Sequence, residues 1–177
     1  MSTPDGTITL RPVEQEDLTL LARWRNDPDH EGRYGDFLAM HRRQTRYPER
    51  WELNGLLAED EGILLICLDS QPVGVFQWHP VTYGPNAGSR AVNLGIAITP
   101  AARGRGIGSR AQRMLADYLF EQTLVHRVEA STDITNLAEQ HALVRAGFTR
   151  EGILRGAQFR LGEWHDMVMY SRLRTDS

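Results

Sequence analysis

The sequence predicts a three-layer domain of the α/β (α+β) class, with a mixed central β-sheet flanked by helices. Two observations support this prediction. Short apolar runs that suit strands alternate with stretches whose apolar residues recur at helical spacing. Paired strand-like runs joined by turn residues also occur towards both ends of the chain, which indicates hairpins. A length of 177 residues without a Pro-, Gly- or Ser-rich linker predicts a single domain over residues 1–177.

The first half of the chain is expected to hold three strands and one helix. Residues 7–11 form the first strand, and residues 14–25 form a helix that Asn26-Asp27-Pro28 ends. Apolar runs at residues 63–69 and 73–79 follow. Ser70-Gln71-Pro72 separates these two runs, so we expect a hairpin with its turn there.

The second half alternates strands and helices before it ends in a hairpin. A loop at residues 83–88 precedes these elements. In chain order we expect a strand at 92–98, a helix at 107–120, a strand at 127–132, a helix at 136–146 and paired strands at 148–159 and 164–173. Gly147 stands where a helix commonly ends in a left-handed residue, which supports the end of the second helix.

Composition excludes several classes of protein and of site. A net charge of −3 and a pI near 6.1 give no electrostatic reason to expect nucleic acid or an anionic membrane as a partner. The single cysteine, Cys67, lies in an apolar run too short to cross a bilayer, and it is expected to be buried and inert. No signal peptide is recognised, so we expect a cytoplasmic protein. No His or Cys pair has the spacing of metal ligands, so no metal is expected.

A glycine- and arginine-rich segment at residues 103–110 is the most informative stretch. It follows the strand at 92–98 and opens the helix at 107–120, with glycines at 104, 106 and 108. The N-terminus of a helix presents unpaired N–H groups and the positive end of its dipole. Glycines allow the backbone to approach an anion closely. The segment therefore predicts a site for a phosphate or a pyrophosphate.

This segment allows three other interpretations. An ATP- or GTP-binding P-loop requires a lysine, and the chain contains none. A dinucleotide site remains open, because residues 106–111 fit G-x-G-x-x-A and Glu129 could bind a ribose, although too little chain follows for such a fold. A turn that binds nothing would leave the arginines at 103, 105, 110 and 113 to repel one another.

Several motifs together resemble one family. Arg103-x-x-Gly106-x-Gly108 is similar to the Q/R-x-x-G-x-G/A signature of the GNAT superfamily of acyl-CoA N-acyltransferases. Asn136, with Gly147-Phe148 eleven residues later, resembles the helix that follows in that family. The opening segment at residues 8–12 and the stretch at 21–28 resemble its ribosomal-protein N-terminal acetyltransferase (Rim-type) branch. The resemblance covers nearly the whole chain.

The resemblance implies a ligand, a reaction and a set of binding residues. Acetyl-CoA would donate an acetyl group to a primary amine, on a protein N-terminus or a small molecule, through a tetrahedral intermediate. It also implies that a homodimer can form. The backbone of the strand at 92–98, near residues 96–98, would stabilise the oxyanion. The residues implied to bind the coenzyme are Ile96, Ala97, Ile98, Arg103, Gly104, Arg105, Gly106, Ile107, Gly108, Ser109 and Asn136.

The usual catalytic residues of the family are missing. Leu143 replaces its general-acid tyrosine, and Asn93 replaces a glutamate that sometimes acts as base. Three carboxylates remain as candidates, and each has a structural alternative. Glu139 could merely complete an N-cap with Asn136, Asp133 could merely stabilise the dipole of that helix, and Asp166 could face solvent.

Two questions stay open at this point. The irregular stretch from residue 30 to 60, with His41, Arg42, Arg43 and Tyr47, is either a solvated surface or, by resemblance, a wall of the acceptor pocket. The loss of the usual catalytic pair also leaves a non-catalytic acyl-CoA-binding module as an alternative to an active enzyme.

Overall fold

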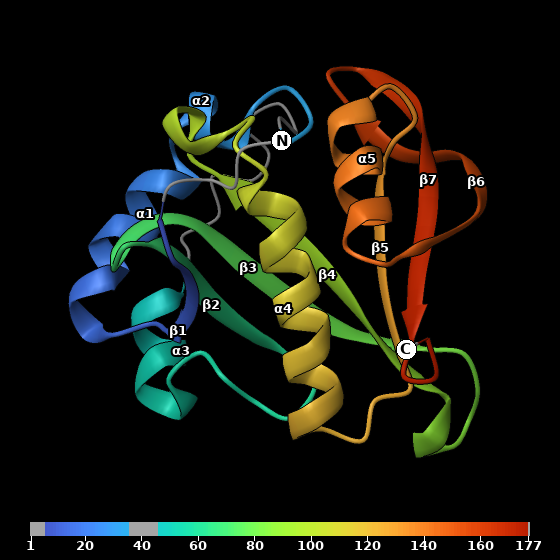
Figure 1. The fold of residues 1–177 in the computed structure, drawn as a ribbon, viewed down its shortest axis with the longest axis horizontal. Coiled ribbons are helices and arrows are strands. Elements are labelled where there is room, and N and C mark those ends of the chain that lie inside the picture. The colour runs from blue at the N-terminus through green and yellow to red at the C-terminus, as the bar shows by residue number, and fades with distance from the viewer. Residues whose placement is uncertain (1–5, 36–45, 177) are drawn as a thin grey trace.

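The computed structural model describes residues 6–35 and 46–176, and its centre is a seven-stranded sheet with the order β1-β2-β3-β4-β5-β7-β6 (Figure 1). Its strands are β1 (Ile8–Pro12), β2 (Gly62–Leu68), β3 (Gln71–Thr82), β4 (Arg90–Ile98), β5 (Arg127–Asp133), β6 (Thr149–Arg160) and β7 (Glu163–Leu173). All neighbours are antiparallel except β4 and β5, which are parallel. The predicted mixed sheet is confirmed.

Helices cover both faces of this sheet. They are α1 (Leu18–Arg25), α2 (Pro28–Glu31), α3 (Tyr47–Asn54), α4 (Ile107–Gln122) and α5 (Leu137–Arg145). Buried residues of α4 and α5 pack on one face, and those of α1 pack with partly buried residues of α3 on the other. The described helices include none that is both long and apolar enough to cross a membrane.

The position of β2 inside the sheet explains why its sequence is a continuous apolar run. Successive strand residues point to opposite faces, and both faces are covered here. Ile63, Leu65 and Cys67 pack towards α1, while the residues between them belong to the core beneath α4. The Cys67 thiol is free and buried, as expected.

Two local predictions were wrong. The turn between β2 and β3 consists of Asp69 and Ser70, whose φ values of 48° and 68° suit a two-residue hairpin turn. Residues 71 and 72, which we expected in the turn, are therefore already part of β3. The helix expected from residue 14 starts as a short 3-10 turn (Gln15–Asp17), and the α-helix begins only at Leu18. Asp17 is held by Arg11 and by the Glu14 N–H, which favours the tighter turn.

The two parallel strands separate soon after they meet. Strands β4 and β5 pair only at Val92–Val128 and Asn93–Glu129, and Figure 1 shows them diverging beyond that point. On its other side β4 stays paired with β3, and the Thr99 N–H donates to the Val73 carbonyl. Because hydrogen-bonded pairs alternate along antiparallel strands, Ile96 and Ile98 turn their backbone N–H and C=O groups towards the gap.

We predict that Gly74→Ala destabilises the fold at this strand pair. An added Cβ would lie 2.6 Å from the backbone oxygen of Ala97, which cannot move without disturbing β4. The free energy of unfolding in urea should fall by about 1–3 kcal/mol. Gly152→Ala is the matched control, because no atom lies within 4 Å of its added Cβ, and it should change stability by less than about 0.5 kcal/mol. Equal effects of the two substitutions would contradict the prediction.

Candidate functional site

Two cavities meet at the gap between β4 and β5. The turn cavity, of about 590 Å³, lies between the start of α4 and α5. The sheet cavity, of about 500 Å³, lies over β3 and β4 on the side of α1. Six residues line both cavities and are called the junction here: His30, Tyr34, Ile96, Ala97, Asn136 and Glu139.

The turn cavity gathers most of the residues that the sequence suggested for coenzyme binding. Arg105 does not line it. The predicted residues that do are Ile96, Ala97, Ile98, Arg103, Gly104, Gly106, Ile107, Gly108, Ser109 and Asn136. Segments from β4, from the glycine turn and from the start of α5 are thus brought to one place, although up to 40 residues separate them in sequence.

The glycine turn has the geometry of an anion cradle. Gly104 and Gly106 have φ values of +73° and +72°, in the left-handed region that favours glycine. An added Cβ at either position would meet no atom within 4 Å, so open space lies beside the backbone. The first N–H groups of α4 have no acceptor within the helix, and its dipole is positive at this end. The residues present therefore fit a phosphate or pyrophosphate.

Arg103 fastens this turn to the rest of the site. Its Nε donates to the Ile98 carbonyl at 2.9 Å, and its Nη2 donates to the carbonyl of His30 at 2.7 Å. Nη2 also reaches the carbonyl of Asp29 at 2.9 Å. These donors hold α2 against the end of β4, so Arg103 positions the walls of the cavity rather than offering those groups to a phosphate.

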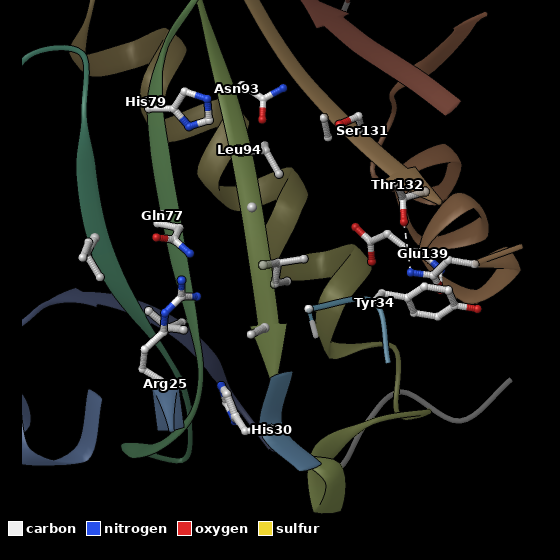
Figure 2. A pocket seen from close by; sticks show the side chains of 18 of the residues that line it. Arg25, His30, Tyr34, Gln77, His79, Asn93, Leu94, Ser131, Thr132 and Glu139 are labelled. Atoms are coloured by element: carbon white, nitrogen blue, oxygen red, sulfur yellow. Dashed lines mark hydrogen bonds between the residues drawn. The ribbon is translucent and has the colours of Figure 1, made fainter. Parts of the chain in front are cut away.

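Glu139 occupies the junction and is chemically unusual. Figure 2 shows its carboxylate pointing from α5 towards β4. Burial raises the pKa of Glu139 to about 7, although a hydrogen bond from Gln112 Nε2 to Glu139 Oε1 at 2.8 Å opposes this shift. A carboxyl group with this pKa exchanges protons near neutral pH, as a general acid or base must.

Glu139 does not complete the capping box that its position allowed. Asn136 caps α5 by accepting from the Glu139 N–H at 3.4 Å, and its own amide donates to Thr132 Oγ1 at 3.0 Å. The Glu139 side chain turns to Gln112 instead of returning to the Asn136 N–H, which donates to the Asp133 carbonyl. Capping alone therefore does not account for Glu139.

Asp133 lines the sheet cavity but is fully engaged. Its Oδ1 accepts from the N–H and the hydroxyl of Thr135, and its Oδ2 pairs with Arg160 and lies 3.2 Å from His165 Nδ1. Burial would raise the pKa of Asp133, but the hydrogen bonds from Thr135 and Arg160 outweigh it and hold the pKa below its usual value. A carboxylate that stays ionised and paired is poorly suited to take a proton from a substrate.

The structure does not bring Asp166 to the site. Asp166 lines neither cavity, and its Oδ1 accepts from the N–H of Gly156 at 2.7 Å. Between Leu154 and Gln158 the pairing of β6 with β7 is interrupted, so this bond ties down an irregular stretch of backbone. Asp166 thus has a structural role that its place in the sequence did not reveal.

Polar side chains from three elements line the sheet cavity. Gln77 and His79 come from β3, Asn93 from β4 and Arg25 from α1. Figure 2 shows Arg25 directed towards Gln77, while His79 and Asn93 gather at the other end of the strands. This wall combines hydrogen-bonding amides with a cationic group.

Part of the stretch from residue 30 to 60 lines the sheet cavity. Tyr34 and Tyr47 line the sheet cavity, and the Tyr34 hydroxyl donates to the Thr135 carbonyl at 3.2 Å. Trp51 instead anchors α3, donating to the Val13 carbonyl at 3.0 Å. His41, Arg42 and Arg43 lie outside the described residues.

Three site residues escaped the sequence reasoning. Gln112 lies on the buried stripe of α4, where a polar residue is itself a signal. Arg160, also buried, pairs with Asp133 and donates to the carbonyl of Arg33. Because 127 residues separate Arg160 from Arg33, no local pattern reveals this contact. His30 is buried and stacked on Trp24 with ring centroids 4.8 Å apart, and neither ring nitrogen has a hydrogen-bond partner in the described structure.

The dinucleotide interpretation is wrong. Glu129, its candidate ribose ligand, lines neither cavity. Its carboxylate accepts from the Tyr83 hydroxyl at 2.7 Å and pairs with Arg127 at 3.0 Å. The largely antiparallel sheet also differs from the doubly wound parallel sheet that such a site requires.

Within the described ranges, no group of three or more His, Cys, Asp or Glu side chains is arranged to hold a metal ion.

Known proteins share this fold and sequence pattern. Probable N-acetyltransferase YjcK of Bacillus subtilis (strain 168) is 28% identical over 179 residues, covering 96% of this chain and 96% of the relative. The structure of Mycobacterium smegmatis RimJ in complex with CoA-disulfide has a TM-score of 0.77 at 26% identity, covering 96% of this chain and 83% of that one. Spermidine N-acetyltransferase from Vibrio cholerae, in complex with CoA and spermine, has a TM-score of 0.76 at 19% identity, covering 96% of both chains.

The family is set by a match that spans most of the chain. The model for the acetyltransferase (GNAT) domain matches residues 7–149, which include β1, the glycine turn, the gap between β4 and β5, and α5. Together with the geometry above, this match shows that the chain belongs to the GNAT family of acetyltransferases.

Proposed function

We propose that this protein transfers an acetyl group from acetyl-CoA to a primary amine at the junction of the two cavities. The observation that carries the proposal is the arrangement of these cavities. One is bordered by an anion cradle and the other by a polar sheet wall, and they share the ionisable Glu139. Two substrates that enter from opposite sides would thus meet beside one proton-exchanging group.

The coenzyme is proposed to occupy the turn cavity. The N–H groups at the start of α4 would hold its pyrophosphate, and the gap-facing backbone groups of Ile96 and Ile98 would hold the extended arm. The complexes of related proteins with CoA support this choice of ligand. When bound, acetyl-CoA supplies an activated thioester carbonyl.

The protein's own groups then provide for charge and protons. A backbone N–H of β4 directed into the gap would stabilise the negative charge that develops on the carbonyl oxygen. Ionised Glu139 would take the proton from the attacking nitrogen, directly or through a water molecule. As the carbon–sulfur bond breaks, the same carboxyl group would return that proton to the leaving sulfur. Asp133 and Asp166 have no part in this proposal.

The sheet cavity favours an acceptor with a single amine, such as a peptide N-terminus. Its described lining contains two carboxylates, Asp133 and Glu139. Arg160 neutralises the first, and the second must exchange the proton of the reacting amine. Among the described lining residues, the additional ammonium groups of a polyamine would lose water without gaining an anionic partner, which is costly. The amides of Gln77 and Asn93 suit neutral hydrogen-bonding groups.

We expect thiol release from acetyl-CoA to depend on an amine. With an alanine-initiated peptide and spermidine as acceptors, kcat/KM should be about tenfold or more higher for the peptide, equivalent to about 1.4 kcal/mol. A preference for spermidine would contradict the proposed acceptor class. Tight binding of acetyl-CoA without thiol release from any of a panel of amines would instead support a non-catalytic binding module.

Gly106→Val should weaken coenzyme binding. The new side chain would fill the open space beside the turn, in the path of the phosphates. Calorimetry should show Kd for CoA raised by about tenfold or more. Gly55→Val is the matched control, since Gly55 has a similar φ of +65° and open surroundings but lies at the end of α3, away from both cavities. If both variants bound CoA like the unchanged protein, the cradle would be misplaced.

Glu139→Gln should remove the acidic limb of the pH profile. Because the pKa of Glu139 is about 7, the fraction of ionised base grows as pH rises through this value, and kcat/KM should rise with it. The variant should lose about 10²–10⁴-fold in kcat/KM and show no limb near pH 7. Its Kd for CoA, measured by calorimetry, controls for damage to the cavity. An unchanged profile would rule out Glu139 as the base.

A further inference from the structure

Gln112 is the side chain that contacts the carboxylate of Glu139. It lies on α4 and is fully buried, and its Nε2 donates to Glu139 Oε1 at 2.8 Å. Among the described residues it is the only side chain that donates a hydrogen bond to this carboxylate. The contact joins the helix of the glycine turn to the helix that Asn136 caps.

The surroundings of Gln112 make it expensive to keep. Ala111, Leu115 and Ala116, its neighbours on the buried side of α4, belong to the apolar core. Its Oε1 is buried and has no hydrogen-bond partner in the described part of the protein. A buried amide that is only half satisfied destabilises a fold, so an apolar residue would serve packing better. Such a breach of the packing rules is expected where a residue serves function.

We infer that Gln112 is the positioning residue of Glu139, and that its buried amide directs the carboxyl group into the junction in both protonation states. The inference rests on the proposed function, in which Glu139 carries the proton. It adds a residue outside the two cavities to the groups that control the reaction.

A glutamine side chain suits both forms of a carboxyl group. An ionised carboxylate only accepts hydrogen bonds, and the Nε2 group donates to it as observed. A protonated carboxyl group can also donate, and a half-turn of the amide presents Oε1 as its acceptor. One side chain thus keeps a hydrogen bond to Glu139 before and after proton transfer. A leucine or a methionine at this position can do neither.

Other charged or titratable groups surround the junction without bonding to Glu139. None of them forms a hydrogen bond or ion pair with it in the described structure. They are His30 and Tyr34 at the junction, Arg33 and Arg103 in the turn cavity, Asp133 from β5, His141 and Arg145 from α5, and, in the sheet cavity, Arg25, Tyr47 and His79. Asp133 is neutralised by Arg160. Gln112 is therefore the direct contact through which the titration of Glu139 can be altered by one substitution.

The test compares the pH dependence of Gln112→Leu and Gln112→Met with that of the unchanged protein. Loss of the amide removes a hydrogen bond from both forms of Glu139, but the bond to the ionised form is the stronger because it is charge-assisted, so the acidic limb of kcat/KM should move from about pH 7 to higher pH. A hydrogen bond to a charged group is strong enough for a shift on the order of one pH unit. NMR titration of the Glu139 carboxyl carbon, without substrates, should show the same shift.

Gln140→Leu is the matched control. Gln140 follows Glu139 on α5 and donates to the Ile134 carbonyl at 2.8 Å, so its loss removes a comparable amide without touching Glu139. This variant should lose stability and keep the limb near pH 7. If Gln112→Leu and Gln112→Met also kept it, Gln112 would be a structural residue and the inference would be overturned.

The failure of the proposed function would look different. If Glu139→Gln kept the limb and the rate, Glu139 would not be the base, and the activity arm of the test would no longer bear on Gln112. The NMR titration would then decide alone. A Glu139 resonance whose midpoint is the same with and without Gln112 would overturn the inference.

Discussion

The loss of pairing between β4 and β5 after Asn93 is the constraint on which the rest of the site depends. A strand that leaves its neighbour exposes backbone donors and acceptors, and buried backbone groups require partners. Here one exposed carbonyl, that of Ile98, is satisfied by Arg103. The remaining groups face the space in which the two cavities meet, so the break in the sheet both opens the site and supplies its polar lining.

The buried ion pair of Asp133 and Arg160 keeps the far side of that gap in place. It joins the end of β5 to the end of β6, and through the carbonyl of Arg33 it reaches the segment after α2. Removal of one partner from such a pair leaves an uncompensated charge, which is strongly destabilising. The carboxylates at the site thus differ: Asp133 is fixed by its ion pair and charged, whereas burial raises the pKa of Glu139 to about 7.

Periodicity and turn chemistry predicted most of the architecture. The apolar run at residues 63–68, the glycine turn and the helix that ends before Gly147 were each expected within one or two residues. Pro72 led to the expectation of a turn at residues 70–72, whereas the left-handed residues Asp69 and Ser70 form it. The partners of Glu139 and Asp133 were out of reach, since Gln112 lies 27 residues before the first and Arg160 lies 27 residues after the second. Only tertiary packing creates those contacts.

The shared wall between the two cavities has a thermodynamic consequence. A ligand in either cavity would lie against Tyr34 and Glu139, which also line the other cavity. Ordering those side chains once lowers the entropic cost for the second molecule, so donor and acceptor assist each other's entry by the same factor. The junction would therefore couple the binding of the two substrates without any movement of distant parts.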